Sequence, residues 1–489
     1  MKDQDYKRKI KFNAVTSYIN LFFNSAILLL ISPLLVGFLG NINFGIWKSV
    51  QRILSITSVA DGRSTQALKS FISNLESDND HNKKKRLLGS ALRVSLYFLP
   101  LTVIVVGLVV FFLPGFINEL PPDIYSTVRL AGFILGLNII LGPLLGIADS
   151  VLIGTNNIYK LNVIQTFTTI LMNGLFLLSS FLGYGILGLA LVSTFILILN
   201  GVIVFLICKK NISWFGLKKP KTEEIKQFFN FSFLIFIWVF VERLFLSTEI
   251  FLIGYLISPI EVTNFSFSSY TIQLGVTVAL LTGSSFTPAL GKFMGARDSY
   301  NSLIVLRNIK MSLRIISIVF GLGIILFNEL FVELWVGESY YLGDFNNYLM
   351  VIVMVQLFMF RNDSQIQDLT LKIKSKVITG LTASILVFTI SITAYHFYPS
   401  ISTIFISIFI SRLIMTIVFR FQVNRHFKIA IEFKDELMVF MLITLTYIMF
   451  HFFIINNNFI FKTLYFILVL WFLYKFLGGS RVFRFFLKK

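Results

Sequence analysis

The chain contains very little of what soluble enzymes use for chemistry. It has one cysteine and four histidines among 489 residues. The single cysteine, Cys208, excludes an internal disulfide and a cysteine metal cluster. The histidines are scattered and show no metal-site spacing, and no Walker A loop is present. We therefore expect no enzyme activity, no catalytic residue, no bound metal, no cofactor, and no ATP hydrolysis by the chain itself.

Charge is also scarce, and apolar residues are abundant. Charged residues make up 14% of the chain and hydrophobic residues 56%, whereas a soluble domain carries about 25% charged residues. Most of the chain consists of apolar runs of about 20 residues or more, long enough to cross a hydrocarbon core of roughly 30 Å. No alternating strand pattern is present, so these runs predict helices. The predicted fold is an all-α polytopic membrane protein with about 14 transmembrane helices, at 13–39, 45–68, 88–113, 125–152, 161–181, 186–207, 228–257, 262–290, 304–328, 346–368, 377–396, 401–419, 437–455 and 459–477.

The basic residues predict the orientation. The net charge is +19, and the predicted loops on one side hold 33 of the 43 basic residues. The opposite loops hold none, but they carry acidic residues. By the positive-inside rule, the basic side is cytoplasmic, both termini lie inside, and the charge excess is a topology signal that indicates no nucleic-acid partner. The first apolar run, of about 27 residues, is too long for a signal peptide and predicts a retained helix.

Charges inside the predicted spans are the first candidates for function, because they are costly in lipid and usually face a partner or a water-filled cavity. Lys48, Arg52 and Arg63 are spaced 4 and 11 residues apart in 45–68, which predicts one helix face. Arg52 and Arg63 would then lie about 16 Å apart along the axis. Such a cationic stripe would bind an anion and pass it across the membrane. Alternatively, Lys48 and Arg52 extend outward to the interface, and Arg63 pairs with Asp61 or lies near the inner surface.

The predicted span 228–257 carries both signs of charge. Glu242 and Glu249 are seven residues apart and share a helix face, so a titratable carboxylate would face a cavity. With Asp61, they are candidates for ion coupling. The alternative is that Arg243 pairs with a carboxylate of another helix.

Two further spans carry candidate charges. Arg129 and Asp149 lie near opposite ends of 125–152. Arg361 lies in the polar inner half of 346–368, which predicts either an inner vestibule or a cytoplasmic projection.

Several short motifs occur in an order that resembles a known transporter family. Residues 40–47 (GNINFGIW) are similar to that family's glycine–aromatic–glycine–x–tryptophan turn. The remaining motifs are Asp61-Gly62, 249–255 (EIFLIGY), 287–290 (TPAL) and 334–337 (LWVG). On these residues the chain resembles the polysaccharide transporter branch, the Wzx-type O-antigen and capsule repeat-unit flippases, of the multidrug/oligosaccharidyl-lipid/polysaccharide exporter (MOP) superfamily. Glu249 stands where the family commonly has aspartate, and Arg63 adds a charge to a usually apolar pattern.

The resemblance implies a MATE-like fold, with two six-helix bundles around a central cavity and two C-terminal helices. We expect an N-terminal bundle over 1–210, a cytoplasmic amphipathic hinge over 211–227, a C-terminal bundle over 228–425, and two additional helices with a basic cytoplasmic tail over 426–489. It also implies a flippase of a bacterial inner membrane. The substrate would be a polyprenyl-diphosphate-linked oligosaccharide, moved to the outer leaflet by alternating access for O-antigen, capsule or exopolysaccharide assembly, next to membrane lipids and polysaccharide polymerase machinery.

The intramembrane arginines fit that expectation, because a diphosphate needs cations at membrane depth. Lys48, Arg52, Arg63, Arg129, Arg243 and Arg361 are therefore the predicted diphosphate- and sugar-binding residues. Two alternatives of the same superfamily are a lipid II flippase, which shares the charge pattern, and a drug/cation antiporter, which would favour an acidic cavity. A membrane glycosyltransferase or O-antigen polymerase would need a large outer loop, and the longest one here is predicted at about 17 residues.

Overall fold

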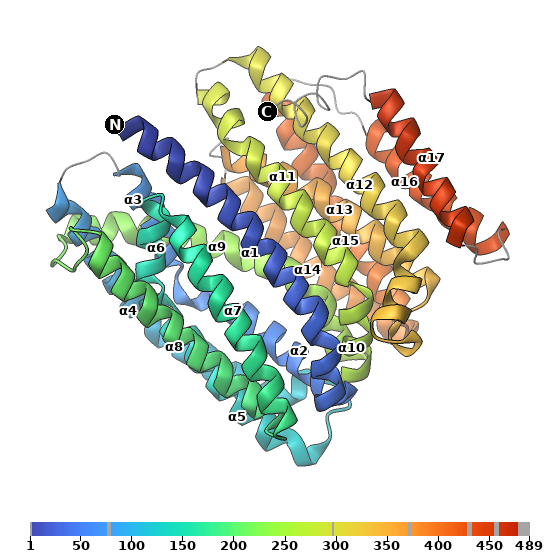
Figure 1. The fold of residues 1–489 in the computed structure, drawn as a ribbon, viewed down its shortest axis with the longest axis horizontal. Coiled ribbons are helices and arrows are strands. Elements are labelled where there is room, and N and C mark those ends of the chain that lie inside the picture. The colour runs from blue at the N-terminus through green and yellow to red at the C-terminus, as the bar shows by residue number, and fades with distance from the viewer. Residues whose placement is uncertain are drawn as a thin grey trace. The chain divides into compact units, whose positions relative to one another are not determined.

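The computed structural model describes residues 2–75, 80–295, 298–369, 373–427, 433–453 and 459–477. In these ranges every regular element is a helix, which confirms the all-α class (Figure 1). The long helices are α1 (Lys2–Leu39), α2 (Asn41–Thr57), α3 (Ser64–Asn74), α4 (His81–Phe112), α5 (Tyr125–Leu145), α6 (Ile147–Gly154), α7 (Ile158–Phe181), α8 (Gly185–Asn211), α9 (Thr222–Leu256), α10 (Pro259–Ser268), α11 (Tyr270–Gly295), α12 (Ser299–Trp335), α13 (Asp344–Leu369), α14 (Ile373–Phe397), α15 (Ile401–Phe427), α16 (Lys434–Ile448) and α17 (Phe459–Leu477). Short 3-10 or π turns, η1 to η5, occupy Ser58–Asp61, Leu113–Phe116, Pro122–Ile124, Glu338–Tyr340 and Met449–Phe453.

Ten of the helices in the described ranges are long and apolar enough to cross a membrane. The number is 11 if α10 and α11, which meet at a 55° bend, form one span. The other predicted spans fall on the α2–α3 segment, on α13 and on the shorter apolar α17. The α2–α3 segment and α13 contain polar residues that the sequence analysis singled out. Their composition is therefore less apolar than that of a lipid-facing helix. The predicted basic tail, Arg481–Lys489, lies outside the described residues.

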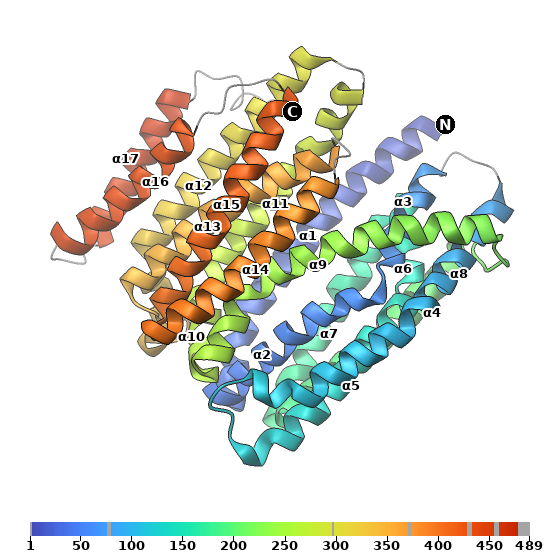
Figure 2. The same cartoon turned by 180° about the vertical axis from the view of Figure 1, so that it is seen from behind.

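The helices group into two compact units, Met1–Thr263 and Asn264–Lys489. In the first unit, α9 packs against α2, α3 and α4 (Figure 2). The predicted hinge therefore lies within the first unit, and so does α9, which the sequence places at the start of the C-terminal bundle. The division into 1–210, 211–227, 228–425 and 426–489 stays a prediction.

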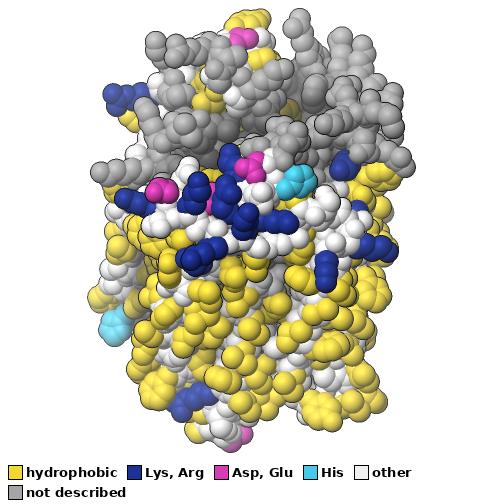
Figure 3. Space-filling view, turned by 90° about the vertical axis from the view of Figure 1, so that its left-hand side faces the viewer, with side chains coloured by type: hydrophobic (Ala, Val, Ile, Leu, Met, Phe, Trp, Pro, Cys, Tyr) yellow, Lys and Arg dark blue, Asp and Glu magenta, His cyan; other side chains and the backbone are white. Residues whose placement is uncertain are grey.

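Side-chain types on the face drawn in Figure 3 are separated along the molecule. Hydrophobic side chains cover most of the lower half of the view, and lysine and arginine side chains gather mainly in a band above them. This is the arrangement that the uneven loop charges predict for a protein that crosses a membrane.

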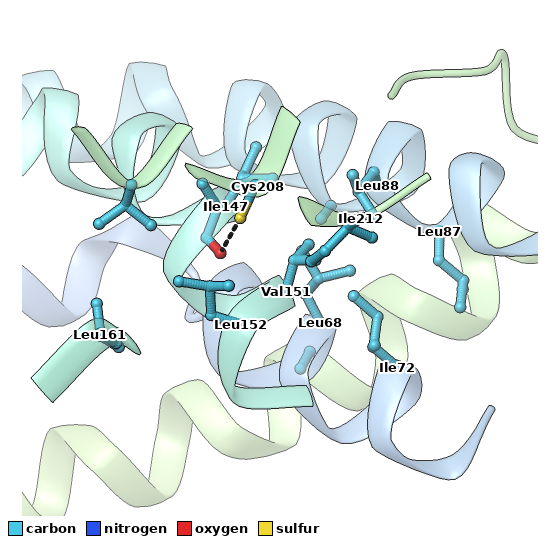
Figure 4. Packing of buried hydrophobic residues seen from close by; sticks show 14 of the residues in the cluster. Leu68, Ile72, Leu87, Leu88, Ile147, Val151, Leu152, Leu161, Cys208 and Ile212 are labelled. Atoms are coloured by element: carbon cyan, nitrogen blue, oxygen red, sulfur yellow. Dashed lines mark hydrogen bonds between the residues drawn. The ribbon is translucent and has the colours of Figure 1, made fainter. Parts of the chain in front are cut away.

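A buried hydrophobic cluster holds α3, α4, α6 and α8 of the first unit together (Figure 4). Leu68 and Ile72 of α3 meet Val151 and Leu152 of α6, all at most 1% exposed. The Cys208 Sγ of α8 lies 3.3 Å from the Ala148 carbonyl oxygen in the same cluster. These contacts fix one face of α3 and one face of α6, so that their other faces are available to line a cavity.

The predicted amphipathic hinge packs on the first turns of α4. Ile212 and Trp214 are buried, and the Lys218 backbone N–H donates to the Lys85 carbonyl at 3.3 Å. Arg86 Nε of α4 donates to Glu224 Oε1 of α9 at 2.8 Å. The segment is therefore attached to α4 and is not a free linker.

The predicted continuous helix 45–68 is wrong in its middle. Helix α2 ends at Thr57, a short 3-10 turn covers Ser58–Asp61, and α3 begins at Ser64. Gly62 and Arg63 between them have φ of 69° and 51°, in the left-handed region. Asp61 Oδ1 accepts a hydrogen bond from the Arg63 backbone N–H at 2.8 Å, which is an aspartate turn. The helix-face argument that placed Lys48, Arg52 and Arg63 on one stripe therefore fails at Arg63.

Gly45 gives a sharp test of the packing in the first unit. A Cβ at Gly45 would lie 1.8 Å from the Pro259 carbonyl oxygen, a backbone atom that has no room to move. A Cβ at Gly107, in the interior of α4, would meet nothing within 4 Å. We expect Gly45→Ala to reduce the yield of folded protein severalfold, and Gly107→Ala to leave it unchanged, in size-exclusion profiles of detergent extracts. Equal yields would show that α2 and the Pro259 turn do not pack this closely.

The second unit contains a buried network of ionic groups. Arg420 of α15 donates from Nε to Asp363 Oδ2 of α13 at 2.7 Å, and its Nη1 pairs with Glu436 of α16. The three side chains are at most 8% exposed. Arg314 of α12 pairs with Asp435, the neighbour of Glu436. Both acidic residues in the first turn of α16 therefore attach that helix to the rest of the unit.

Candidate functional site

Seven of the nine predicted site residues lie within the first unit as one electrostatic group. Arg52 of α2 interacts electrostatically with Glu249 and Arg243 of α9. Lys48, one turn before Arg52, interacts with Arg52. The charged residues that the sequence singled out on α2 and on α9 therefore lie close enough to interact.

Arg63 belongs to the same group although it lies beyond the helix break. It interacts electrostatically with Asp61, Arg243 and Glu242. Its Nε lies 3.6 Å from Asp61 Oδ1, and its Nη2 donates to Ser58 Oγ at 3.3 Å. The turn thus places the Arg63 side chain against Ser58 and Asp61, where it also interacts with the charges of α9.

The conformation of Arg63 is costly, which indicates a function. The left-handed region costs a non-glycine residue of order 1–2 kcal/mol, and such strain concentrates at functional sites. The Arg63 side chain is buried, and its Nε has no acceptor within hydrogen-bonding distance among the described residues. A buried guanidinium N–H without a partner is a donor available to a ligand.

A polar cavity of about 410 Å³ lies beside this turn. One side is formed by the η1 turn and α3, and the other by the end of α5 and by α6. Irregular backbone at membrane depth is tolerated where it is buried in protein or lines a water-filled cavity, and discontinuous helices build the substrate sites of many transporters. All lining residues belong to the first unit: Ser58, Asp61, Arg63, Thr65, Gln66, Lys69, Asn138, Ile139, Gly142, Pro143, Gly146, Asp149, Ser150 and Ile153.

The sequence explains why both walls are interrupted at the same level. On one wall, Asp61-Gly62 supplies the turn. On the other wall, Pro143 and Gly146 precede the short helix α6. A Cβ placed on Gly146 would lie 3.4 Å from the Thr65 side chain of α3. Ser150 Oγ donates to the Thr65 carbonyl at 2.9 Å and so joins the two walls.

Two of the predicted site residues are not part of this group. Arg129 lies at the start of α5, is exposed, and contacts Phe111 through a cation–π contact and a hydrogen bond to its carbonyl at 3.2 Å. Arg361 lies on α13 in the second unit. Arg129 therefore stabilises the packing of α5 on α4, because its side chain is held by Phe111.

Sequence reasoning missed Lys69 and Asn138, and it gave Asp149 too little weight. Lys69 lies on α3, which extends to Asn74, whereas the sequence places it in a cytoplasmic loop. Asn138 and Asp149 are 11 residues apart, on α5 and α6, and both line the cavity. The glycines and the proline between them were the available signal, since they predict an interrupted helix.

The fold is shared with transporters of known structure. The lipid II flippase MurJ in its inward closed conformation matches with a TM-score of 0.68 and 18% identity over 95% of this chain and 99% of that chain. The MATE multidrug transporter DinF-BH matches with a TM-score of 0.65 and 15% identity over 86% and 97%. The eukaryotic MATE transporter AtDTX14 matches with a TM-score of 0.63 and 15% identity over 90% and 99%. The chain therefore has the fold of MurJ and the MATE transporters.

Comparisons of sequence add nothing to this result. No protein-family model matches the chain. No curated protein matches it either. The three solved structures above are of two transporters and a flippase.

Proposed function

We propose that this chain, a multi-pass membrane protein with the fold of MurJ and the MATE transporters, is a flippase for a polyprenyl-diphosphate-linked oligosaccharide. It would move the repeat unit from the cytoplasmic to the outer leaflet of a bacterial inner membrane, with both of its termini in the cytoplasm. The product would supply the polymerase machinery for O-antigen, capsule or exopolysaccharide.

The charge group of the first unit is the observation that carries the proposal. Lys48, Arg52, Arg63 and Arg243 are four cations against the carboxylates of Asp61, Glu242 and Glu249. A diphosphate is a compact anion that arginine binds with forked hydrogen bonds. A carrier of organic cations would need the opposite excess of charge. Asp61, Glu242 and Glu249 stay candidates for ion coupling, because each interacts with an arginine that the substrate would engage.

A lipid II flippase is the second candidate. The structure of MurJ matches 95% of this chain, whereas the MATE structures described above match 86% and 90%. Lipid II carries the same diphosphate and lipid tail, so the charge group fits either substrate.

A chromosomal deletion in the source bacterium separates these functions. We expect loss of surface polysaccharide and accumulation of complete lipid-linked repeat units, measured by mass spectrometry of extracted polyprenyl lipids. Plasmid-borne wild-type protein should reverse both effects. Accumulation of lipid II instead would support the second candidate. Unchanged lipid intermediates with a new sensitivity to organic cations would reject both and favour a drug exporter.

A further inference from the structure

The cavity between α3 and α6 contains polar groups of two kinds on opposite walls. The side formed by η1 and α3 carries the cations Arg63 and Lys69 and the carboxylate of Asp61, which pairs with Arg63. The α5–α6 side carries two acceptor oxygens, Asn138 Oδ1 and Asp149 Oδ1, which are buried and have no hydrogen-bond partner among the described residues. Buried polar atoms are almost always hydrogen-bonded, so each such exception requires an explanation.

The unpartnered atoms specify the chemistry of a ligand that would satisfy them. Arg63 Nε is a buried donor without a hydrogen bond, since the Asp61 carboxylate with which it pairs lies 3.6 Å away, and an anionic group would satisfy it. Asn138 Oδ1 and Asp149 Oδ1 are acceptors without a donor, and they call for hydroxyl or amide N–H groups. No ion pair of Lys69 or Asp149 is found in the part of the chain that the structure describes. A bound inorganic cation would satisfy the two oxygens, but it would leave Arg63 Nε without an acceptor.

A ligand with an anionic group at one end and several hydroxyls at the other satisfies both walls at once. Phosphorylated sugars have this composition. Ser58, Thr65, Gln66 and Ser150 add hydroxyls and an amide to the lining, and these groups hydrogen-bond sugars as donors or acceptors. The Asp61 carboxylate, which also lines the cavity, is paired with Arg63 at 3.6 Å. The cavity volume of about 410 Å³ lies within the range of roughly 300–1,000 Å³ of small-molecule sites.

We propose that this cavity binds the first sugar of the lipid-linked saccharide together with the phosphate attached to it. Arg63 and Lys69 bind the phosphate, and Asn138 and Asp149 accept hydrogen bonds from the sugar. The inference rests on the proposed function, and it adds a sugar subsite to the charge group of α2 and α9. The cavity therefore contributes to the choice among saccharides as well as to the binding of their common diphosphate.

The experiment uses the purified full-length protein in nanodiscs, with three soluble probes: glucose 1-phosphate, inorganic phosphate and glucose. Binding is followed by competition against a radiolabelled sugar phosphate. Wild type should bind glucose 1-phosphate at least about tenfold more tightly than either inorganic phosphate or glucose, since the two walls act on one molecule. Lys69→Gln should weaken both phosphate-containing probes.

Asp149→Asn is the decisive variant, because it has the same shape and should fold. It should lower the affinity for glucose 1-phosphate about tenfold, because a neutral amide oxygen is a weaker acceptor than a carboxylate oxygen. It should not weaken the binding of inorganic phosphate, because the change removes a negative charge from the cavity. Asn138→Leu should have the same pattern, which provides a second test if either variant folds poorly. The matched controls are Glu223→Gln and Lys209→Gln, at exposed positions of α9 and α8; they should change nothing.

The inference is overturned if Asp149→Asn and Asn138→Leu both leave the preference for glucose 1-phosphate over phosphate unchanged. It is also overturned if wild type shows no such preference. The proposed function has a separate readout, the appearance of lipid-linked saccharide in the outer leaflet of proteoliposomes. Translocation by wild type without a sugar preference would remove the subsite and keep the flippase, whereas absence of translocation would reject the flippase whatever the probes show.

Discussion

Arg63→Gln is expected to lower the rate of lipid-linked saccharide translocation at least about tenfold while the protein stays folded. Arg63 combines a buried guanidinium N–H that has no hydrogen-bond partner with electrostatic interactions with the charges of η1 and α9. A hydrogen bond to a charged group is worth about 1.5–3 kcal/mol, and each 1.4 kcal/mol is a factor of about ten. Arg52→Gln should have a similar effect, because Arg52 interacts with Glu249 and Arg243 of the same group.

The measurement is the fraction of fluorescent lipid-linked saccharide that an impermeant reagent modifies on proteoliposomes. Arg63→Lys should retain part of the activity, since it keeps the charge but loses the planar fork of donors. Arg63→Asn removes the charge without straining the backbone, because asparagine tolerates a left-handed φ. It should therefore lose activity as Arg63→Gln does. Lys209→Gln, at an exposed position, should translocate the lipid-linked saccharide at the wild-type rate. Translocation at the wild-type rate by both Arg63→Gln and Arg52→Gln would reject the assignment of the diphosphate to this group.

Arg420→Met is expected to destabilise the second unit by about 3–5 kcal/mol, the usual cost of leaving a buried charge without its partner. Asp363 and Glu436 both bond to Arg420 and are almost fully buried. Without the guanidinium, two carboxylates from α13 and α16 would face each other away from water. Because Glu436 lies in the first turn of α16, the variant should also loosen that helix.

Thermal unfolding of the protein in detergent, followed by tryptophan fluorescence, measures the loss. Arg425→Met is the matched control, since Arg425 is an exposed residue of the same helix, α15. Adding Asp363→Asn and Glu436→Gln to Arg420→Met should recover part of the stability, because both buried negative charges are then removed. Equal unfolding temperatures for Arg420→Met and Arg425→Met would show that the network contributes little.

The order of helices could be predicted from the sequence because lipid imposes a simple rule on it. Backbone groups in hydrocarbon must bond within their own helix, so each long apolar run has only one available structure. The same rule identified the segments 45–68 and 346–368 as unusual, since charges inside a span require a partner. It could not decide what those charges meet.

The amino-acid sequence by itself therefore determined the all-α membrane fold and drew attention to Lys48, Arg52, Asp61, Arg63, Glu242, Arg243 and Glu249. Only the tertiary structure showed that α2 stops at Thr57, that Arg63 interacts with the charges of α9, and that Lys69, Asn138 and Asp149 share a cavity with Arg63. The physical reason is that the first result depends on each segment alone, whereas the second depends on contacts between segments that are distant in the sequence. Hydrophobicity acts on each segment separately, whereas a turn at Asp61-Gly62 and a break at Gly146 form a site only when packing places them side by side.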